Sequence, residues 1–518
     1  MIVRKSREAV ADFLEDESHA FVAPAEGVEA IYYPETEENV ISIMTEANER
    51  RGLVSVSGGG TGVTGARVPM LGGIVVSMES VLAARPSALE AIEYQGVAGR
   101  ATVRLDRDKL VASVPPGISL QDLGKALPHD ILYPPDPTET SALLGGTIAT
   151  NASGARSFHY GATRRWVEGL RVVLGSGDLL VVKRGDVTAD SKGILDFRVE
   201  GGKEYKIKIP TYKMPGVKHN AGLFAEPGMD LIDLFAGSEG ILGIVTEATL
   251  RLERKPSRFL YDTAFFPDEG RALAFVGELR ASKGYGVLSI EFFDSNSLTF
   301  LREALPDVKE GAKAAVFTEF ASADASAMDS LSSALRMHGS IDDWCAYSER
   351  DAQGLKDVRH ALPERVNSYL KERGSAKLGT DFAVPLQAFP EMMKIYTETG
   401  NRFKAMFPRK GVHHVLFGHA GDCHLHFNFI AETGEEMAAA RKLYVDMARK
   451  AVSLGGTISA EHGLGKKCFD IDGRKAPYLE LMYGMEGLEQ IAAVKRALDP
   501  NLILNVGTVV PAEYLKKG

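Results

Sequence analysis

Cysteine is scarce in this 518-residue chain, which holds only Cys345, Cys423 and Cys468. The three lie far apart in the sequence and form no CxxC pair, so we expect neither a disulfide framework nor a cysteine-based zinc site. This pattern favours a reducing cytoplasm, and a peripheral position on the inner face of a membrane is left open.

Long apolar runs and dense basic runs are missing as well. The first 21 residues contain no apolar stretch of signal-peptide length, and no later window approaches about 18 uninterrupted apolar residues. We therefore predict no transmembrane segment and no export by a signal peptide. The net charge is −9, and no run of lysine and arginine reaches the density that binding to a phosphate backbone would require, which argues against nucleic acid as a partner.

What is present resembles an ordinary globular protein, with 45% hydrophobic and 25% charged residues. A chain of this length exceeds the size at which one core keeps growing, so two or three domains are expected. Residues 30–57 are predicted to form a strand, a helix and a strand, and short β-rich runs continue to residue 250. Helical segments begin to alternate with strands near residue 255. We predict an α+β protein with a first domain over 1–255, a second over 256–455, and a C-terminal segment, 456–518, that returns to the first.

Residues 60–65 spell GTGVTG, a literal GxGxxG motif that follows a predicted strand. In a Rossmann fold this motif opens a helix whose N-terminus holds a pyrophosphate. Here Pro69 and another β-rich run follow almost at once, which leaves no room for that helix. We interpret the full stretch SGGGTGVTG as a loop whose backbone N–H groups wrap a phosphate directly. A flexible glycine turn is the alternative.

Two further stretches are rich in small residues, LLGGTIATNASGARSFHYG at 143–161 and LFAGSEGILGIVTEATLRL at 234–252. Small side chains let the backbone approach a flat or charged ligand closely, and both stretches are expected to be loops that run into strands. Three such loops in one half of the chain indicate a large cofactor.

Seven segments occur in the order that is typical of one family: SVSGGGTGVTG, PPDPTETSALLGGTIATNASG, FHYGATRRWVEGLRVVLGSG, GSEGILGIVTEATLRL, GHAGDCHLHFN, SAEHGLG and DPNLILN. Over nearly its whole length the chain resembles the FAD-linked oxidases of the vanillyl-alcohol oxidase superfamily, which have a PCMH-type FAD-binding domain. Within them it is similar to the D-2-hydroxyacid dehydrogenases of D-lactate, D-2-hydroxyglutarate and glycolate. The resemblance implies two small α/β subdomains around FAD, and an antiparallel-sheet cap with flanking helices that carries the substrate site.

The resemblance also implies where FAD lies. Residues 57–62 would bind its pyrophosphate, and the other segments would line the rest of it. His159 lies close to one of these segments, but the nearest relatives hold FAD noncovalently, and we expect the same here. The implied FAD-binding residues are Ser57, Gly58, Gly59, Gly60, Thr61, Gly62, Gly145, Gly146, Asn151, Ser153, Gly154, Gly161, Glu239, Gly240, Ile244, Val245 and Asn505.

Three histidines fall within eight residues in the segment HAGDCHLHFN, 419–428. His419 and His426 are seven apart and would point to opposite faces of one straight strand, so a turn between them is needed to bring them together. Glu461 adds a carboxylate, and two histidines with one carboxylate form a common site for Zn²⁺ or a similar Lewis-acidic ion. His424 shares strand parity with His426 and is the rival ligand.

By resemblance, the metal ligands are His419, His426 and Glu461, and the neighbouring His462 is the general base that takes the hydroxyl proton. The alternative is purely structural, with histidines that cap strands and a glutamate on the surface. Relatives usually have GDGN where this chain has GDCH, so Cys423 and His424 depart from the family pattern. The segment 213–235 is longer than the usual motif, so a loop near the flavin is expected to differ.

A carboxylate substrate calls for arginine or lysine in the cap, because a guanidinium fixes a planar carboxylate with two hydrogen bonds. Arg359 and Lys377 lie where relatives carry such residues, although the spacing after Lys377 differs from that of the hydroxyglutarate dehydrogenases. For both residues a surface cation is the alternative.

We therefore predict an FAD-dependent, metal-assisted dehydrogenase that oxidises a D-2-hydroxyacid to the 2-oxoacid by hydride transfer to flavin N5. D-lactate is the first expected substrate, and D-2-hydroxyglutarate or glycolate comes next. Because no Rossmann context is present, we expect the electron acceptor to be a quinone, a cytochrome, an electron-transfer flavoprotein or an iron–sulfur protein. Two other functions stay open, a flavin transferase similar to alkyl-dihydroxyacetonephosphate synthase and a flavin-carrying electron-transfer subunit. A homodimer is also considered.

Overall fold

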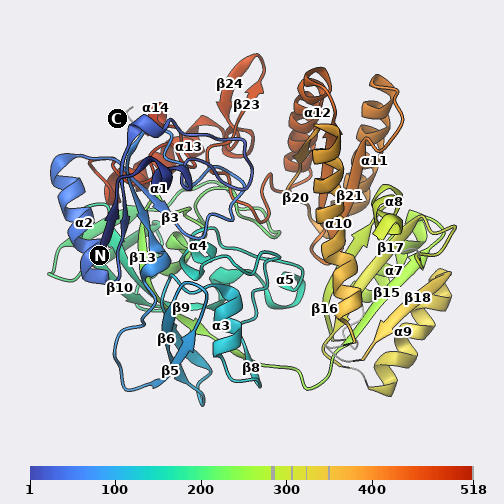
Figure 1. Ribbon diagram of the computed structural model, residues 1–518, viewed down its shortest axis with the longest axis horizontal. Helices are drawn as coiled ribbons and strands as arrows, with labels where there is room; N and C mark the ends of the chain where they lie inside the picture. The colour runs from blue at the N-terminus through green and yellow to red at the C-terminus, as the bar shows by residue number, and fades with distance from the viewer. Residues whose placement is uncertain (282–285, 305–306, 323, 348–350, 516–518) are drawn as a thin grey trace.

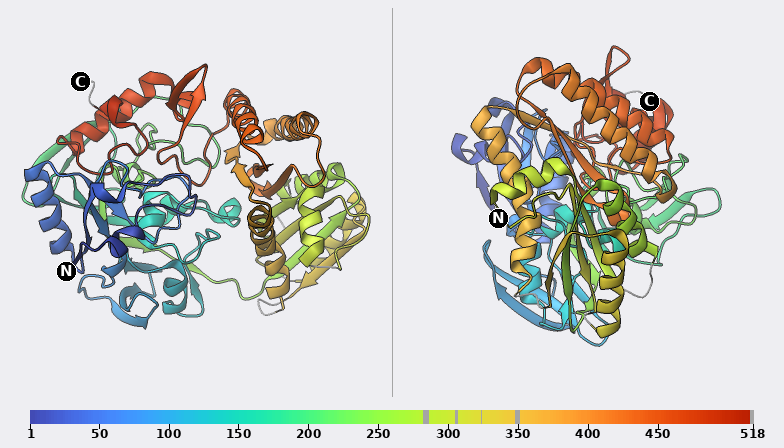
Figure 2. Two further views of the ribbon diagram at one scale, coloured as in Figure 1. Left: turned by 45° about the horizontal axis from the view of Figure 1, so that its top comes forward. Right: turned by 90° about the vertical axis from the view of Figure 1, so that its right-hand side faces the viewer.

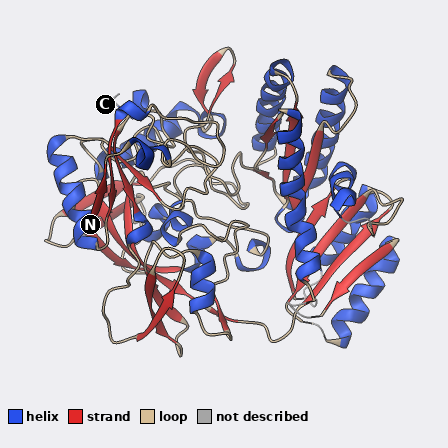
Figure 3. Cartoon of the chain, viewed as in Figure 1, coloured by secondary structure: helices blue, strands red, loops and turns tan. Residues whose placement is uncertain are grey.

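The computed structural model describes residues 1–281, 286–304, 307–322, 324–347 and 351–515. The first half of the chain and the C-terminal segment lie together on one side, and the cap lies on the other (Figure 1). Loops and short helices occupy the centre, between the sheets of the first half and the cap (Figure 3). The predicted fold class is confirmed, because helices and mostly antiparallel sheets are mixed along the chain.

The first sheet has the strand order β1-β2-β4-β3. Helix α2 (Glu37–Arg50) follows β2, and its apolar face packs on the sheet because Val40, Ile43 and Met44 recur at helical spacing. Both β2 and β3 pair with β4 in parallel, so the predicted βαβ unit is present. The bounds are β1 (Ile2–Arg4), α1 (Arg7–Ala11), β2 (Val28–Tyr33), β3 (Val54–Ser57) and β4 (Gly73–Ser77).

The second sheet is antiparallel and has the order β10-β9-β13-β7-β6-β5. Short helices and two small two-stranded sheets surround it. The bounds are β5 (Glu90–Gln95), β6 (Arg100–Asp106), β7 (Val111–Val114), α3 (Leu120–Ala126), β8 (Ile131–Leu132), α4 (Leu144–Ala149), α5 (Ser157–Tyr160), β9 (Val167–Leu174), β10 (Leu179–Lys183), β11 (Ile194–Arg198), β12 (Glu204–Lys208), α6 (Leu231–Phe235), β13 (Gly243–Arg251) and β14 (Glu253–Arg254).

The second small-residue stretch was expected to be a loop, and this is wrong in part. Leu144–Ala149 form helix α4, whose Leu144 and Ile148 are fully buried in the main core. That burial outweighs the low helix propensity of Gly145 and Gly146. Glycine is required at residue 145, since an added Cβ would lie 2.8 Å from Pro116 Cβ.

The cap is built on an antiparallel sheet with the order β18-β15-β17-β16-β21-β22-β19, and β20 pairs with β22. Helices α7 and α9 pack on one face and α8 and α10 on the other, as the membership of the two apolar clusters shows (Figure 2). The bounds are β15 (Leu260–Phe266), α7 (Glu269–Ala281), β16 (Val287–Phe293), α8 (Ser295–Ala304), β17 (Ala314–Phe320), α9 (Ala325–His338), β18 (Asp342–Ala346), α10 (Gln353–Arg373), β19 (Ala376–Gly379), β20 (Phe382–Ala383), α11 (Phe389–Met406), β21 (His414–His419), β22 (His424–Ala431) and α12 (Gly434–Ser453).

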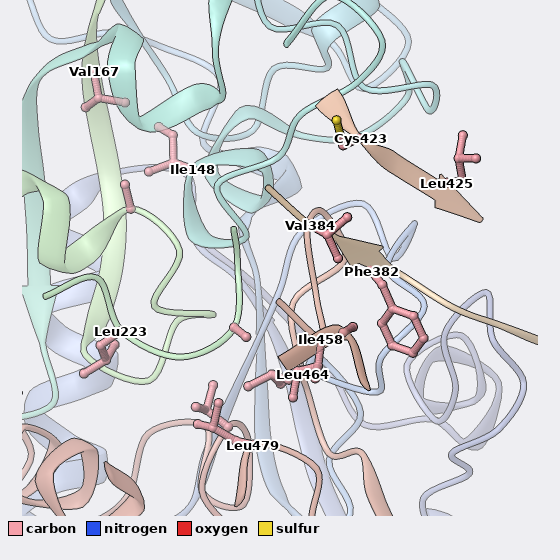
Figure 4. Packing of buried hydrophobic residues seen from close by; sticks show 14 of the residues in the cluster. Ile148, Val167, Leu223, Phe382, Val384, Cys423, Leu425, Ile458, Leu464 and Leu479 are labelled. Atoms are coloured by element: carbon pink, nitrogen blue, oxygen red, sulfur yellow. The ribbon is translucent and has the colours of Figure 1, made fainter. Parts of the chain in front are cut away.

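The C-terminal segment crosses from the cap to the first sheet. Ile458 and Leu464 share one core with Phe382 and Val384 of the cap (Figure 4). Farther on, the backbone N–H of Val54 donates to the carbonyl of residue 503 at 2.8 Å, so the tail runs beside β3. The remaining elements are β23 (Cys468–Ile471), β24 (Arg474–Pro477), α13 (Glu480–Leu498) and α14 (Ala512–Leu515). Among the described residues, no helix combines the length and the apolar character that crossing a bilayer requires.

Candidate active site

A cavity of about 370 Å³ lies among the glycine-rich segments of the first half of the chain. The loop after β3, the start of α4, strand β13 and the returning tail all contribute to its wall. Its lining also includes Glu461 and His462, which belong to the segment that crosses from the cap. One cavity therefore joins the predicted cofactor site to the predicted catalytic residues.

The loop after β3 adopts the conformation that the glycines allow. Within the fully described stretch 58–72 there is no helix, so the Rossmann interpretation is excluded by the structure as well. Gly60 has a φ of +80°, and a Cβ at that position would overlap the guanidinium of Arg67. Any other residue at position 60 would therefore have a strained backbone and would displace the Arg67 side chain.

Most of the predicted FAD-binding residues line this cavity. They are Gly58, Gly59, Gly60, Thr61, Gly62, Gly145, Gly146, Ser153, Glu239, Gly240, Ile244, Val245 and Asn505. Ser57, Asn151, Gly154 and Gly161 are not among its lining residues. Ser57 is fully buried, and the Asn151 side chain accepts the backbone N–H of Arg164 at 2.8 Å. Gly161 ends α5 and lines a separate surface hollow.

Two of the lining residues tie the walls together. The Glu239 carboxylate accepts the backbone N–H groups of Leu464 and Gly465 at 2.7 and 2.8 Å. The side chain of Asn505 accepts the N–H of Val56 at 2.8 Å and donates to the carbonyl of Glu239 at 3.1 Å. Their side chains thus hold the tail and the segment after Glu461 against the first half of the chain.

The three clustered histidines lie on one face of the cap sheet. A turn at Ala420–Asp422 reverses the chain between β21 and β22, and Cys423 completes it with a φ of +53°. The register places His419 directly opposite His424, and His426 follows two residues on, so all three point to the same side. Their ring centroids are 4.5 to 5.4 Å apart. The turn that the spacing required is present.

Glu461 reaches this cluster from the crossing segment. Its two carboxylate oxygens lie 3.1 Å from His419 Nε2 and 3.8 Å from His426 Nε2. The other ring nitrogens face acceptors, since His419 Nδ1 is 2.6 Å from Glu291 and His426 Nδ1 is 3.3 Å from the carbonyl of Thr380. Histidines that ligate metals have this arrangement, in which one nitrogen is held by an acceptor and the other faces the ion.

The charges of the cluster also fit a bound cation. Glu291, Asp422 and Glu461 bring carboxylates, and Lys218 brings an ammonium group that contacts Glu461 and lies 3.5 Å from Asp422. Burial would lower the pKa of His419, but the carboxylates of Glu291 and Glu461 outweigh it and raise the pKa to about 9. A proton on His419 thus offsets part of the negative charge of these carboxylates. A bound metal ion would offset the same charge in its place.

His462 is held by Asp381. One Asp381 oxygen accepts the backbone N–H of His462 at 2.9 Å and lies 3.2 Å from its Nδ1, and the Ser459 hydroxyl donates to the same oxygen at 2.7 Å. Asp381 is fully buried, whereas the His462 side chain is 38% exposed and lines the cavity. The arrangement fixes the imidazole and leaves Nε2 for proton transfer.

Sequence reasoning did not find Lys218, Glu291 or Asp381. Each comes from a segment distant from the histidine motif, and no local pattern marks its role. Lys218 does lie in the segment 213–235 that departs from the family motif, and Asp381 follows Lys377 closely. In the sequence, only these two positions could have drawn attention to Lys218 and Asp381.

The two predicted substrate-binding cations have different outcomes. Arg359 belongs to α10, which packs on the histidine-bearing face of the cap sheet, but its side chain lies outside the described residues. Lys377 pairs with Ile430, four residues along β22 from His426 and thus about 13 Å away at roughly 3.3 Å per residue. Its Nζ donates to Asn367 at 2.8 Å, so it is not brought to the cluster.

The α+β fold thus combines a cavity lined by glycine-rich segments with a cluster of histidines and carboxylates, which is the arrangement predicted for an FAD-linked enzyme. The sequence profile described as "FAD binding domain" matches residues 28–183, and that described as "FAD linked oxidases, C-terminal domain" matches residues 255–509. The chain therefore belongs to the FAD-linked oxidase family, and the predicted resemblance is confirmed.

Several relatives match along nearly their whole length. A glycolate oxidase subunit of Bacillus subtilis is 27% identical, over 94% of this chain and 90% of its own. A D-lactate dehydrogenase of Archaeoglobus fulgidus is 28% identical, over 96% and 94%. A D-2-hydroxyglutarate dehydrogenase of Xanthomonas citri is 29% identical, over 92% and 88%. An alkyldihydroxyacetonephosphate synthase structure shares the fold, with a TM-score of 0.66 and 16% identity, over 97% of this chain and 81% of its own.

Proposed function

We propose that the protein is an FAD-dependent, metal-assisted dehydrogenase of D-2-hydroxyacids, with D-lactate as first substrate and D-2-hydroxyglutarate or glycolate next. The observation that supports this most is the continuity of one cavity, from the glycine-rich segments to Glu461 and His462. A substrate at that junction would lie between the flavin site and a positioned base. The names of the relatives support the same substrate class.

The chemistry divides between the bound groups and the side chains. Bound FAD would supply the hydride acceptor, and His419, His426 and Glu461 would hold a divalent ion that supplies Lewis acidity. His462 takes the hydroxyl proton as the hydride leaves C2, and Asp381 holds its ring for that step. Arg359 stays our prediction for the residue that orients the substrate carboxylate.

The electrons must then leave the flavin. The glycine loop after β3 lacks the helix of a dinucleotide-binding Rossmann fold, so we propose an acceptor other than NAD, such as a quinone, a cytochrome, an electron-transfer flavoprotein or an iron–sulfur protein. The likeness to alkyldihydroxyacetonephosphate synthase is one of fold and does not favour the transferase.

Anaerobic mixing tests the proposal. The purified protein is mixed with D- and L-lactate, D- and L-2-hydroxyglutarate and glycolate, and the loss of flavin absorbance is followed. We expect D-acids to bleach the flavin far faster than their enantiomers. If no 2-hydroxyacid reduces the flavin, the proposal of a dehydrogenase is wrong, and a transferase or an electron-transfer subunit becomes the favoured function.

A further inference from the structure

His424 has no role in the function proposed so far, yet its setting is unusual. The side chain is fully buried, and within the described part of the chain neither ring nitrogen makes a hydrogen bond. Its Nε2 lies 2.9 Å from Asp381 Oδ1, which is an electrostatic contact, whereas Nδ1 has no hydrogen-bond partner among the described residues. An unsatisfied nitrogen in a fully buried ring is costly, so a partner for Nδ1 is expected.

The position of His424 identifies that partner. One ligand atom from each of His419, His424, His426 and Glu461 lies within 4.8 Å of all the others. His424 is directly opposite His419 in the hairpin, and its ring centroid is 4.5 Å from that of His426. A single ion among these four side chains would satisfy a nitrogen of His424 together with the other donors.

We propose that His424 is a fourth protein ligand, so that three imidazoles and one carboxylate hold the ion of the proposed active site. This inference rests on the metal-assisted function proposed above. It has a consequence for the choice of metal. An ion that takes only four ligands, as structural zinc does, would have every position filled by the protein. A site that also admits substrate oxygens therefore needs an ion that readily takes more than four ligands.

Metal binding by purified variants tests the role of His424. Wild-type protein, His424→Asn and His424→Gln are stripped with a chelator, and the affinity for Co²⁺ is measured by competition with a chromophoric chelator. The absorption spectrum of bound Co²⁺ reports the donor set. Glu461→Gln shows the effect of losing a carboxylate ligand, and His414→Asn replaces a neighbouring histidine that stacks on Phe427 outside the cluster. FAD content and the melting temperature check that each variant is folded.

We expect both His424 variants to lose more Co²⁺ affinity than the roughly 10- to 100-fold that loss of a supporting residue costs, with a changed Co²⁺ spectrum. His414→Asn should bind like wild type. If both His424 variants keep wild-type affinity and spectrum while Glu461→Gln loses binding, His424 is not a ligand, and only the role proposed for His424 is wrong. If the wild type itself binds no Co²⁺, both this role and the metal-assisted function are wrong.

Discussion

Replacement of Asp381 by asparagine tests how much the fixed imidazole of His462 contributes to catalysis. The substitution keeps the size of the side chain but removes its charge and leaves one acceptor oxygen where there were two. That oxygen cannot serve both His462 and the donors of Ser459 and Glu461, which the carboxylate accepts together. The amide nitrogen instead turns a donor toward groups that themselves donate.

The expected decrease in the rate of flavin reduction follows from the hydrogen bonds that Asp381 loses. A hydrogen bond to a charged group contributes about 1.5–3 kcal/mol, which corresponds to about 10- to 150-fold in rate. A base in the wrong tautomer loses further activity, since positioned proton transfer contributes about 10²- to 10⁴-fold. We therefore expect flavin reduction by D-lactate to slow by at least about 10²-fold in Asp381→Asn.

Anaerobic stopped-flow absorbance measures this rate directly, and FAD content and the melting temperature show whether the variant is folded. Ser459→Ala is the matched control, because it removes one donor to Asp381 and leaves the carboxylate in place. A folded Asp381→Asn protein that reduces its flavin at nearly the wild-type rate would refute the positioning role.

Three further predictions concern other residues. His462→Asn should keep metal and FAD yet slow flavin reduction about 10²- to 10⁴-fold, and metal loss in this variant would show that the roles of His462 and Glu461 are wrongly assigned. Arg359→Lys should raise KM for the acid and weaken transition-state binding by about 1–3 kcal/mol, because the two-pronged contact is lost; unchanged kinetics would remove Arg359 from the site. Burial raises the pKa of Asp262 to about 7, so the contribution of this carboxyl to stability is lost as pH rises from about 4 to about 7, and Asp262→Asn should lack this contribution. Between pH 4 and 8 the variant should gain up to about 4 kcal/mol on wild type in denaturant unfolding, whereas a difference that stays constant with pH would contradict the shift.

Local patterns in the sequence predict the parts of the fold that depend on neighbours along the chain. The periodicity of α2 between two β-rich runs predicted the βαβ unit, and Pro69 after the glycine motif excluded a Rossmann helix. The seven ordered segments identified the family. Helix α4 was missed because its first turn holds Gly145 and Gly146, and the burial of Leu144 and Ile148 in the main core, which stabilises it, is not visible in a local pattern.

The site was predicted where its residues share a motif and missed where they do not. His419, His426, Glu461 and His462 lie in two short segments, and the need for a turn between the first two followed from strand geometry alone. Asp381 accepts hydrogen bonds from Glu461 and His462, about 80 positions away in the sequence. These contacts form because β20 pairs with Thr457 of the crossing segment through Ala383. No spacing in the sequence encodes such a contact.

In the proposed function, the FAD cavity and the histidine and carboxylate cluster form one site for a D-2-hydroxyacid. The most direct measurement is anaerobic flavin reduction by D-lactate, D-2-hydroxyglutarate and glycolate in three samples of one preparation: protein as purified, protein stripped with a chelator, and stripped protein to which metal has been returned. We predict rapid bleaching in the first sample with at least one of these acids, its loss in the second while FAD stays bound, and its return in the third. Full bleaching by the stripped protein, or no bleaching by any of the acids in any sample, would contradict a metal-assisted dehydrogenase of D-2-hydroxyacids.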